Sequence, residues 1–294
     1  MGRGLSTRAA LTRGGARGTL APVKVHHLNC LTMCPVGGRL FNRARRFACH
    51  VLLIESEQGL VLVDTALGLD ALRALDEWTA PTFVRLVRPQ VDESMTALRQ
   101  IEALGHRAAD VRHIVLTHLD TDHAGGLADF PAAQVHLLGD EHDAAQARAT
   151  AMERDRYNPR QWAHGPAWRL HRPRGERWYG FESVRDIPGL PPEILLVPLV
   201  GHTRGHAGVA VDLGSRWLLH CGDAYFDRDE LRSEGGGALP LRLFQRAEAT
   251  DHGARLRNLA RLRDLSSGVG EGVTLFCAHD PDELSRLQAG AGAG

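Results

Sequence analysis

The chain has 294 residues, 43% of them hydrophobic, which is enough apolar material for one large core. Its 35 Lys and Arg residues balance 35 Asp and Glu residues, so it offers no basic face for nucleic acid. No apolar run is long enough to cross a bilayer. Composition therefore argues against both nucleic-acid and membrane partners.

The first 21 residues contain arginine but no acidic residue, because the first acid of the chain is Glu55. They also lack the apolar stretch of a secretory signal. We predict a disordered basic tail over residues 1–21, with a transit peptide as the alternative, and a single domain over residues 22–290.

The cysteines are odd in number and show no metal-finger spacing. They are Cys30, Cys34, Cys49, Cys221 and Cys277. This pattern is typical of reduced thiols and predicts a cytoplasmic protein. Cys221 and Cys277 are interpreted as small packing residues rather than metal ligands.

The first predicted strands cover residues 51–54 and 60–63, and a turn containing Gly59 joins them into a hairpin. Asp64 follows the second strand, where it either caps a helix or accepts hydrogen bonds near a metal site. Caps and periodicity then predict a helix over residues 92–104, ending at Gly105.

A β-branched segment, residues 111–116, predicts a buried strand, and the run THLDTDHAGG follows it at residues 117–126. This run places two imidazoles and two carboxylates within six positions, at His118, Asp120, Asp122 and His123. Loops at strand ends hold ligands in α/β folds, and a turning backbone lets these side chains converge. The spacing indicates a metal site, although either aspartate could instead cap a short helix.

Three further apolar segments end in residues that bind metals. His202 follows residues 194–200, Asp223 follows residues 216–220, and His279 follows residues 273–276. Because the same arrangement recurs at four strand ends, chance capping or solvation is a poor explanation for the whole set.

The order of these motifs resembles the metallo-β-lactamase superfamily, whose pattern is H-x-H-x-D-H, then G-H-T-x-G-H, then an isolated Asp and a late His. The resemblance covers roughly residues 51–287. It implies an α/β fold, namely a four-layer αββα sandwich with the ligand loops along one edge. It also implies a dinuclear metallo-hydrolase with two divalent ions, zinc first, with iron or manganese as alternatives.

By position in the family motifs, His118 and His202 would hold the first ion. Asp122, His123 and His279 would hold the second, and Asp223 would bridge them. His206 is expected to orient neighbouring backbone rather than to bind metal.

The chain departs from the family pattern at Asp120, which stands where the second His is expected. As a ligand, Asp120 would give the first position two imidazoles and a carboxylate, a set that suits iron(II). The added negative charge should also make a bridging water less acidic. Asp120 could alternatively be a hydrogen-bond acceptor beside the ligands, or mark a site for one metal.

Within this superfamily the chain looks closest to the N-acyl-homoserine lactonases, which share the H-x-x-x-D-H-A-G-G run. Those enzymes place a substrate-contacting Tyr three residues after the bridging Asp, where this chain has Phe226 preceded by Tyr225. Two segments outside the scaffold, residues 140–192 and 226–265, are expected to cover the metals. Aromatic residues of the first segment could line an acyl pocket or simply anchor the segment to the core.

The predicted reaction is hydrolysis of an ester-like bond, in a lactone or a related small molecule, by a hydroxide between the two ions. Asp122 would be the catalytic group that passes a proton to the leaving alkoxide. The alternative is a mononuclear iron enzyme of sulfur and oxygen redox chemistry, resembling persulfide dioxygenases. The oligomeric state is left open, with a homodimer compatible with the sequence.

Overall fold

The computed structural model describes residues 23–173, 177–183, 187–269 and 272–291. The predicted tail, residues 1–21, lies outside them, and the single domain over 22–290 stays a prediction. Among the described residues, no helix combines the length and apolar character needed to cross a membrane.

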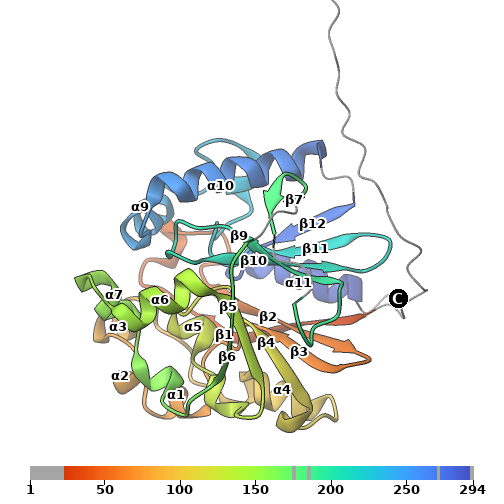
Figure 1. The fold of residues 1–294 in the computed structure, drawn as a ribbon. Helices are drawn as coiled ribbons and strands as arrows, with labels where there is room; N and C mark the ends of the chain where they lie inside the picture. Colours follow the sequence, from red (N-terminus) through yellow and green to blue (C-terminus); the bar gives the residue numbers. More distant parts are fainter. Residues whose placement is uncertain (1–22, 174–176, 184–186, 270–271, 292–294) are drawn as a thin grey trace, which may run out of the picture.

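Two β-sheets pack against each other at the centre of the molecule (Figure 1). The larger sheet has the strand order β1 to β6, with β1 at Lys24–Met33, β2 at Phe47–Ser56, β3 at Gly59–Val63, β4 at Val111–Val115, β5 at Gln134–Leu138 and β6 at Ala167–His171. The smaller sheet has the order β12-β11-β10-β9, with β9 at Ile194–Pro198, β10 at Ala207–Asp212, β11 at Trp217–His220 and β12 at Val273–Phe276. A short hairpin joins β7, Arg177–Trp178, to β8, Phe181–Glu182.

Helices cover the outer faces of both sheets (Figure 1). Those along the first half of the chain are α1 at Leu69–Arg73, α2 at Leu75–Trp78, α3 at Pro81–Val87, α4 at Ala97–Ala103, α5 at Thr121–Ala124, α6 at Gly139–Ala147 and α7 at Ala151–Arg156. The later helices are α8 at Asp229–Arg232, α9 at Leu239–Glu248, α10 at His252–Asp264 and α11 at Pro281–Ala291. The expected four-layer αββα sandwich is confirmed.

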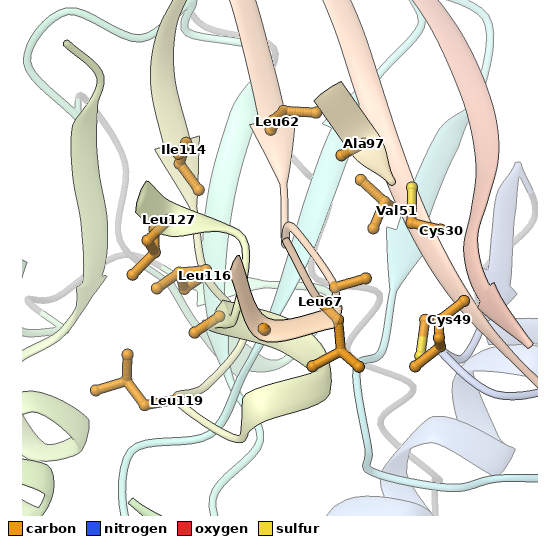
Figure 2. Packing of buried hydrophobic residues seen from close by; sticks show 14 of the residues in the cluster. Cys30, Cys49, Val51, Leu62, Leu67, Ala97, Ile114, Leu116, Leu119 and Leu127 are labelled. Atoms are coloured by element: carbon orange, nitrogen blue, oxygen red, sulfur yellow. The ribbon is translucent and has the colours of Figure 1, made fainter. Parts of the chain in front are cut away.

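Each of three apolar clusters occupies one interface between layers. Leu52, Val63, Val115 and Val209 meet between the sheets, because alternate strand residues point to opposite faces. The cluster under the helices of the larger sheet includes Leu116, Leu119 and Leu127 (Figure 2). The third cluster packs the smaller sheet against α10. These buried leucines thus anchor the loop that follows β4 to the core.

The predicted hairpin and strands are confirmed, whereas the predicted helix over residues 92–104 is wrong in its first turn. Asp92 accepts a hydrogen bond from the Ser94 amide and begins a separate 3₁₀ turn at Glu93–Met95. The Thr96 hydroxyl then accepts from the Arg99 amide, so α4 begins at Ala97. Two successive capping residues interrupt the helix, because each offers the backbone a competing partner.

Candidate metal centre

The seven predicted ligand residues lie together at one edge of the two sheets. Their side chains are at most 17% exposed. They are His118, Asp120, Asp122 and His123 from the loop after β4, His202 from the β9–β10 connection, Asp223 after β11, and His279 after β12. β11 and β12 are parallel, so the segments that follow them leave the same edge of the sheet.

Asp223 occupies the centre of the group. Its Oδ1 lies 3.2 Å from His123 Nε2 and 3.1 Å from His279 Nε2. Its Oδ2 lies 3.4 Å from His202 Nε2, 3.9 Å from His118 Nε2 and 3.2 Å from His279 Nε2. One carboxylate is therefore surrounded by four imidazoles, as a residue shared by two ions would be.

The donor atoms fit divalent metals in type, spacing and lack of other partners. His118, His202 and Asp223 form one set whose ligand atoms lie within 4.8 Å of one another, and His123, Asp223 and His279 form another. Within the described residues, the buried atoms His118 Nε2, His123 Nε2 and Asp223 Oδ1 make no hydrogen bond. Buried polar groups normally have hydrogen-bond partners. A cluster of buried ligand atoms that lack such partners is a feature of a metal centre.

Asp120 lies beside two members of the first of these sets. Its Oδ2 lies 3.0 Å from His202 Nε2 and 3.4 Å from His118 Nε2, whereas its buried Oδ1 has no hydrogen-bond partner among the described residues. The residue does stand at the N-cap position of α5, but its side chain makes no capping hydrogen bond. The helix-cap interpretation is therefore wrong, and the carboxylate faces the imidazoles.

Asp64 and Thr117 orient the histidines from behind. Asp64 Oδ2 accepts from His123 Nδ1 at 2.8 Å and from the Thr117 hydroxyl at 2.8 Å, and Oδ1 accepts from the Thr117 amide. Asp64 has a φ of 60°, a left-handed backbone that is uncommon outside glycine. Of the two interpretations of Asp64, acceptor near the ligands is the one that the structure shows.

Two further histidine nitrogens are held by the backbone. His206 Nδ1 donates to the Leu199 carbonyl, which leaves Nε2 to accept from the Asp223 amide at 2.8 Å. His279 Nδ1 donates to the Ala48 carbonyl at 2.8 Å, which turns its Nε2 toward Asp223. The orienting role expected for His206 is confirmed, and Asp223 is the residue that it positions.

Glu141 ties two ligand loops together, and sequence reasoning missed it. This fully buried carboxylate accepts from the amides of Leu119 and Gly205 and from the Tyr157 hydroxyl. Its position in the acidic first turn of α6 looks like ordinary helix chemistry, so only the long-range contacts reveal its role.

The two sides of the centre differ in their electrostatics. Burial opposes protonation of His123 and His279, but the surrounding carboxylates, Asp223 foremost, prevail and raise the pKa of both imidazoles well above the ordinary value. On the other side, burial and the nearby Arg156 guanidinium lower the pKa of His202 to about 4. Burial opposes ionisation of Asp120, but Arg156 together with His118 and His202 outweighs it and holds the pKa of that carboxyl well below its usual range.

A cavity of about 390 Å³ opens over the centre. Asp120, Asp122, Asp223, His202 and His279 line its floor. Its wall is largely apolar and comes from the segment after β1 and from α3, α7 and α9, including Met33, Phe41, Phe83, Leu86, Met152 and Phe244. Sequence analysis identified the floor and two segments of the wall, 140–192 and 226–265, and missed the part that residues 33–87 contribute.

The aromatic residues of segment 140–192 anchor that segment instead of lining the cavity. Trp162 and Trp168 pack against the cluster under the larger sheet, and Trp178 lies in the cluster beneath α10. Tyr225 is also turned away, since its hydroxyl donates to the buried Glu283. Phe226 faces the cavity with its ring centroid 4.7 Å from that of His279, so an aromatic ring without a hydroxyl lies beside the centre.

Comparisons with known proteins agree with this geometry. A family model described as the metallo-beta-lactamase superfamily matches residues 44–269. A Mycobacterium tuberculosis protein named "Probable metallo-hydrolase" is 45% identical over 261 residues, which cover 89% of this chain and 81% of that protein. An N-acyl homoserine lactonase of Rhizobium radiobacter is 27% identical over 207 residues, covering 68% of this chain and 70% of its own.

Solved structures share the fold. The structure of an N-acyl homoserine lactone hydrolase with the product N-hexanoyl-L-homoserine at its metal centre superimposes with a TM-score of 0.66. It covers 92% of this chain and 97% of its own at 19% identity. At that identity the likeness establishes the arrangement of the layers alone.

Proposed function

Because the chain belongs to the metallo-beta-lactamase superfamily, we propose that it is a hydrolase that uses two divalent ions to cleave an ester-like bond, such as that of a lactone. The observation that carries this proposal is the position of Asp223, which belongs to two sets of candidate ligand atoms, one with His118 and His202 and one with His123 and His279. A centre for a single ion would have no need of the second set.

The proposed ligands divide between two positions. His118, Asp120 and His202 would hold the first ion, Asp122, His123 and His279 the second, and Asp223 would belong to both. Imidazole and carboxylate ligands suit zinc, which we propose as the native metal, with iron or manganese as alternatives. When bound, such ions generate a nucleophile from water at neutral pH and polarise a carbonyl.

Asp122 is the residue placed to manage the leaving group. Its side chain is 13% exposed and lines the cavity, with Oδ2 3.7 Å from His279 Nε2. A carboxylate at the boundary between the ligands and the cavity can hold a proton and pass it to an alkoxide that departs toward solvent.

The cavity wall supports a substrate with an apolar portion. Phenylalanine and methionine side chains surround an acidic floor, so an acyl chain would contact the wall while the ester group reaches the centre. The lactonase relative, whose name specifies an N-acyl homoserine lactone, supports a lactone as that ester.

The direct test is a substrate panel on metal-replete enzyme, with metal content measured on the same sample. We expect two ions per chain and hydrolysis of acylated lactones, at a kcat/KM that rises with acyl length until the cavity is filled. Lactones, thioesters, phosphodiesters and sulfate esters of matched apolar groups should be compared. Preference for a phosphodiester or sulfate ester would defeat the proposed bond type.

The Asp122→Asn variant tests the proton-transfer role. With metal supplied in excess so that both ions stay bound, we expect it to lose activity most on esters with poor leaving groups, because good leaving groups need no proton. Equal loss on all esters would contradict the role. Asp155→Asn, which changes another cavity-lining carboxylate, is the matched control.

A redox alternative follows from one observation, the carboxylate of Asp120 beside two imidazoles, which is a ligand set for iron(II). It predicts one iron per chain and thiol-dependent oxygen uptake. The second ligand set, around His123 and His279, favours the hydrolase. Metal stoichiometry in protein purified without chelator separates the two.

A further inference from the structure

Arg156 is a buried arginine at the end of α7 that reaches the first side of the centre. Its side chain is 5% exposed, and its Nη1 lies 3.4 Å from Asp120 Oδ2. The same nitrogen donates to the carbonyl of His202 at 3.2 Å. Arg156 thus contacts two of the three residues proposed for the first ion, and neither contact involves a substrate.

The other end of the guanidinium is also engaged. Nη2 donates to the backbone carbonyl of Glu248 and lies 3.3 Å from its carboxylate, at the last residue of α9. Arg156 therefore joins the metal loop, the His202 loop and a helix of the cavity wall. It is the only cationic arginine or lysine side chain among the residues that line the cavity.

We propose that Arg156 and Asp120 work as a pair, in which the guanidinium balances the carboxylate that stands where the family motif has a neutral histidine. The inference rests on the proposed metal centre. Three aspartates contribute three negative charges, and Arg156 returns one positive charge. The balance is then the same as for a centre with two aspartates and a histidine at position 120.

Replacing Arg156 and replacing Asp120 should change the metal affinity in opposite directions. Without Arg156, Asp120 attracts a bound cation unopposed, so the ions should be held more tightly and the metal-free protein should be less stable. With histidine at position 120 and Arg156 kept, a buried cation lies beside the ions without its carboxylate, so the ions should be held more weakly. Replacing both residues should bring the affinity back.

The added negative charge of Asp120 is expected to make a bridging water less acidic. The positive charge of Arg156 acts in the opposite direction. The sequence shows the added carboxylate, but the compensating charge lies 36 positions further along the chain, on a different helix. Arg156 is therefore a positioning residue, which acts on the centre through Asp120 and the His202 loop.

The experiment is a double-mutant cycle of wild type, Arg156→Met, Asp120→His and the double variant. Zinc dissociation constants are measured by competition with a chromophoric chelator, and urea unfolding is followed on the chelator-treated proteins. We expect Arg156→Met to tighten zinc binding about tenfold or more, and Asp120→His to weaken it by a similar factor, since a neighbouring buried charge is worth at least that much. The double variant should return to within about threefold of wild type.

Two controls keep the cycle decisive. Arg156→Lys retains the charge, so it should keep near-wild-type zinc affinity. Arg156→Gln, which keeps hydrogen-bond donors without the charge, replaces Arg156→Met if that variant fails to fold. Arg255→Met removes another buried arginine, one that donates to Gln245 and the Ala224 carbonyl. It should leave zinc affinity unchanged and destabilise the chelator-treated protein by an amount that adds to the effect of Asp120→His.

Additive losses of stability in the chelator-treated single and double variants would overturn the pair, because paired groups couple, and so would an unchanged zinc affinity in Arg156→Met. Both results leave the metal centre standing, because wild type still binds zinc in them. Failure of the wild-type protein to bind any divalent metal would instead defeat the proposed function, and the pair with it.

Discussion

Two groups of histidines in this molecule differ in the side chains that surround them. His113, His136 and His171 form a row across β4, β5 and β6, with His113 Nδ1 2.9 Å from His136 Nε2 and His136 Nδ1 3.0 Å from His171 Nε2. His118, only five residues after His113, belongs to the candidate centre. The same strand therefore leads from a row of paired imidazoles to a cluster of ligands.

The difference lies in the partners. Each contact in the row joins one imidazole to another, and the charges that act on His136 are those of neighbouring imidazoles and Arg169. In the centre, imidazole nitrogens face the carboxylates of Asp120, Asp122 and Asp223. Burial and His113 lower the pKa of His136 to about 3, whereas carboxylates raise that of His123. In this molecule the candidate cation site is the group of histidines that buried carboxylates accompany.

The largest effect on metal content and activity is expected from removing the carboxylate of Asp223, which the two proposed ion positions share. In Asp223→Asn, four imidazoles lose the anion that faces them, and we expect loss of bound metal and a fall in kcat/KM of at least about 1000-fold, the scale for a group acting directly on transition-state charge. Metal analysis and kinetics on the preferred ester provide the measurement. Asp212→Asn, at the end of β10, should retain both metal and activity. Full activity of Asp223→Asn would remove the basis of the proposed function.

The row of histidines predicts that the free energy of unfolding depends on pH through His136. His136 has a pKa of about 3 in the folded protein, so the unfolded chain, near 6.5, binds the proton more readily. The contribution of neutral His136 to the free energy of unfolding is complete above pH 6.5. It is lost as the pH falls toward 3, and the loss reaches about 3 kcal/mol at pH 4. His136→Gln should remove this part of the acid sensitivity while keeping an amide that can pair with both neighbours. The measurement is urea unfolding of chelator-treated wild type and His136→Gln at pH 7 and pH 4. If both proteins lose the same free energy of unfolding between the two pH values, the prediction is wrong.

The contrast also explains which parts of the molecule the sequence could predict. The ligand loop, residues 117–126, is contiguous, and the other ligands each follow an apolar strand, so local patterns were sufficient. The histidine row was invisible, because His113, His136 and His171 become neighbours only through parallel pairing of β4, β5 and β6. Whether a histidine binds metal depends on partners that the sequence does not place next to it.

Charge compensation and the part of the cavity wall that precedes β4 were unpredictable for the same reason. Arg156 lies in a helix with ordinary caps, and nothing local distinguishes it from the surface arginines nearby. The wall combines segments as distant as Met33 and Phe244. Composition did indicate aromatic residues in segment 140–192, but composition cannot say whether a tryptophan faces a core or a cavity.

Asp64 provides the finest test, because it makes His123 unlike the histidines of the row. In the row an imidazole orients the next imidazole, whereas Asp64 orients His123 with a buried carboxylate that also fixes Thr117. In Asp64→Asn, His123 keeps a hydrogen-bonding partner but loses the charge, and we expect metal affinity to fall about 10-fold to 100-fold, as for other residues that orient ligands. Chelator competition should show one weakened ion and one retained, because Asp64 contacts only the second position. Asp129→Asn, at a buried aspartate that accepts from the Leu69 amide, controls for the loss of a buried carboxylate. Equal weakening of both ions would show that Asp64 acts on the whole loop through Thr117, and the distinction between the two groups of histidines would then rest on the ligating carboxylates alone.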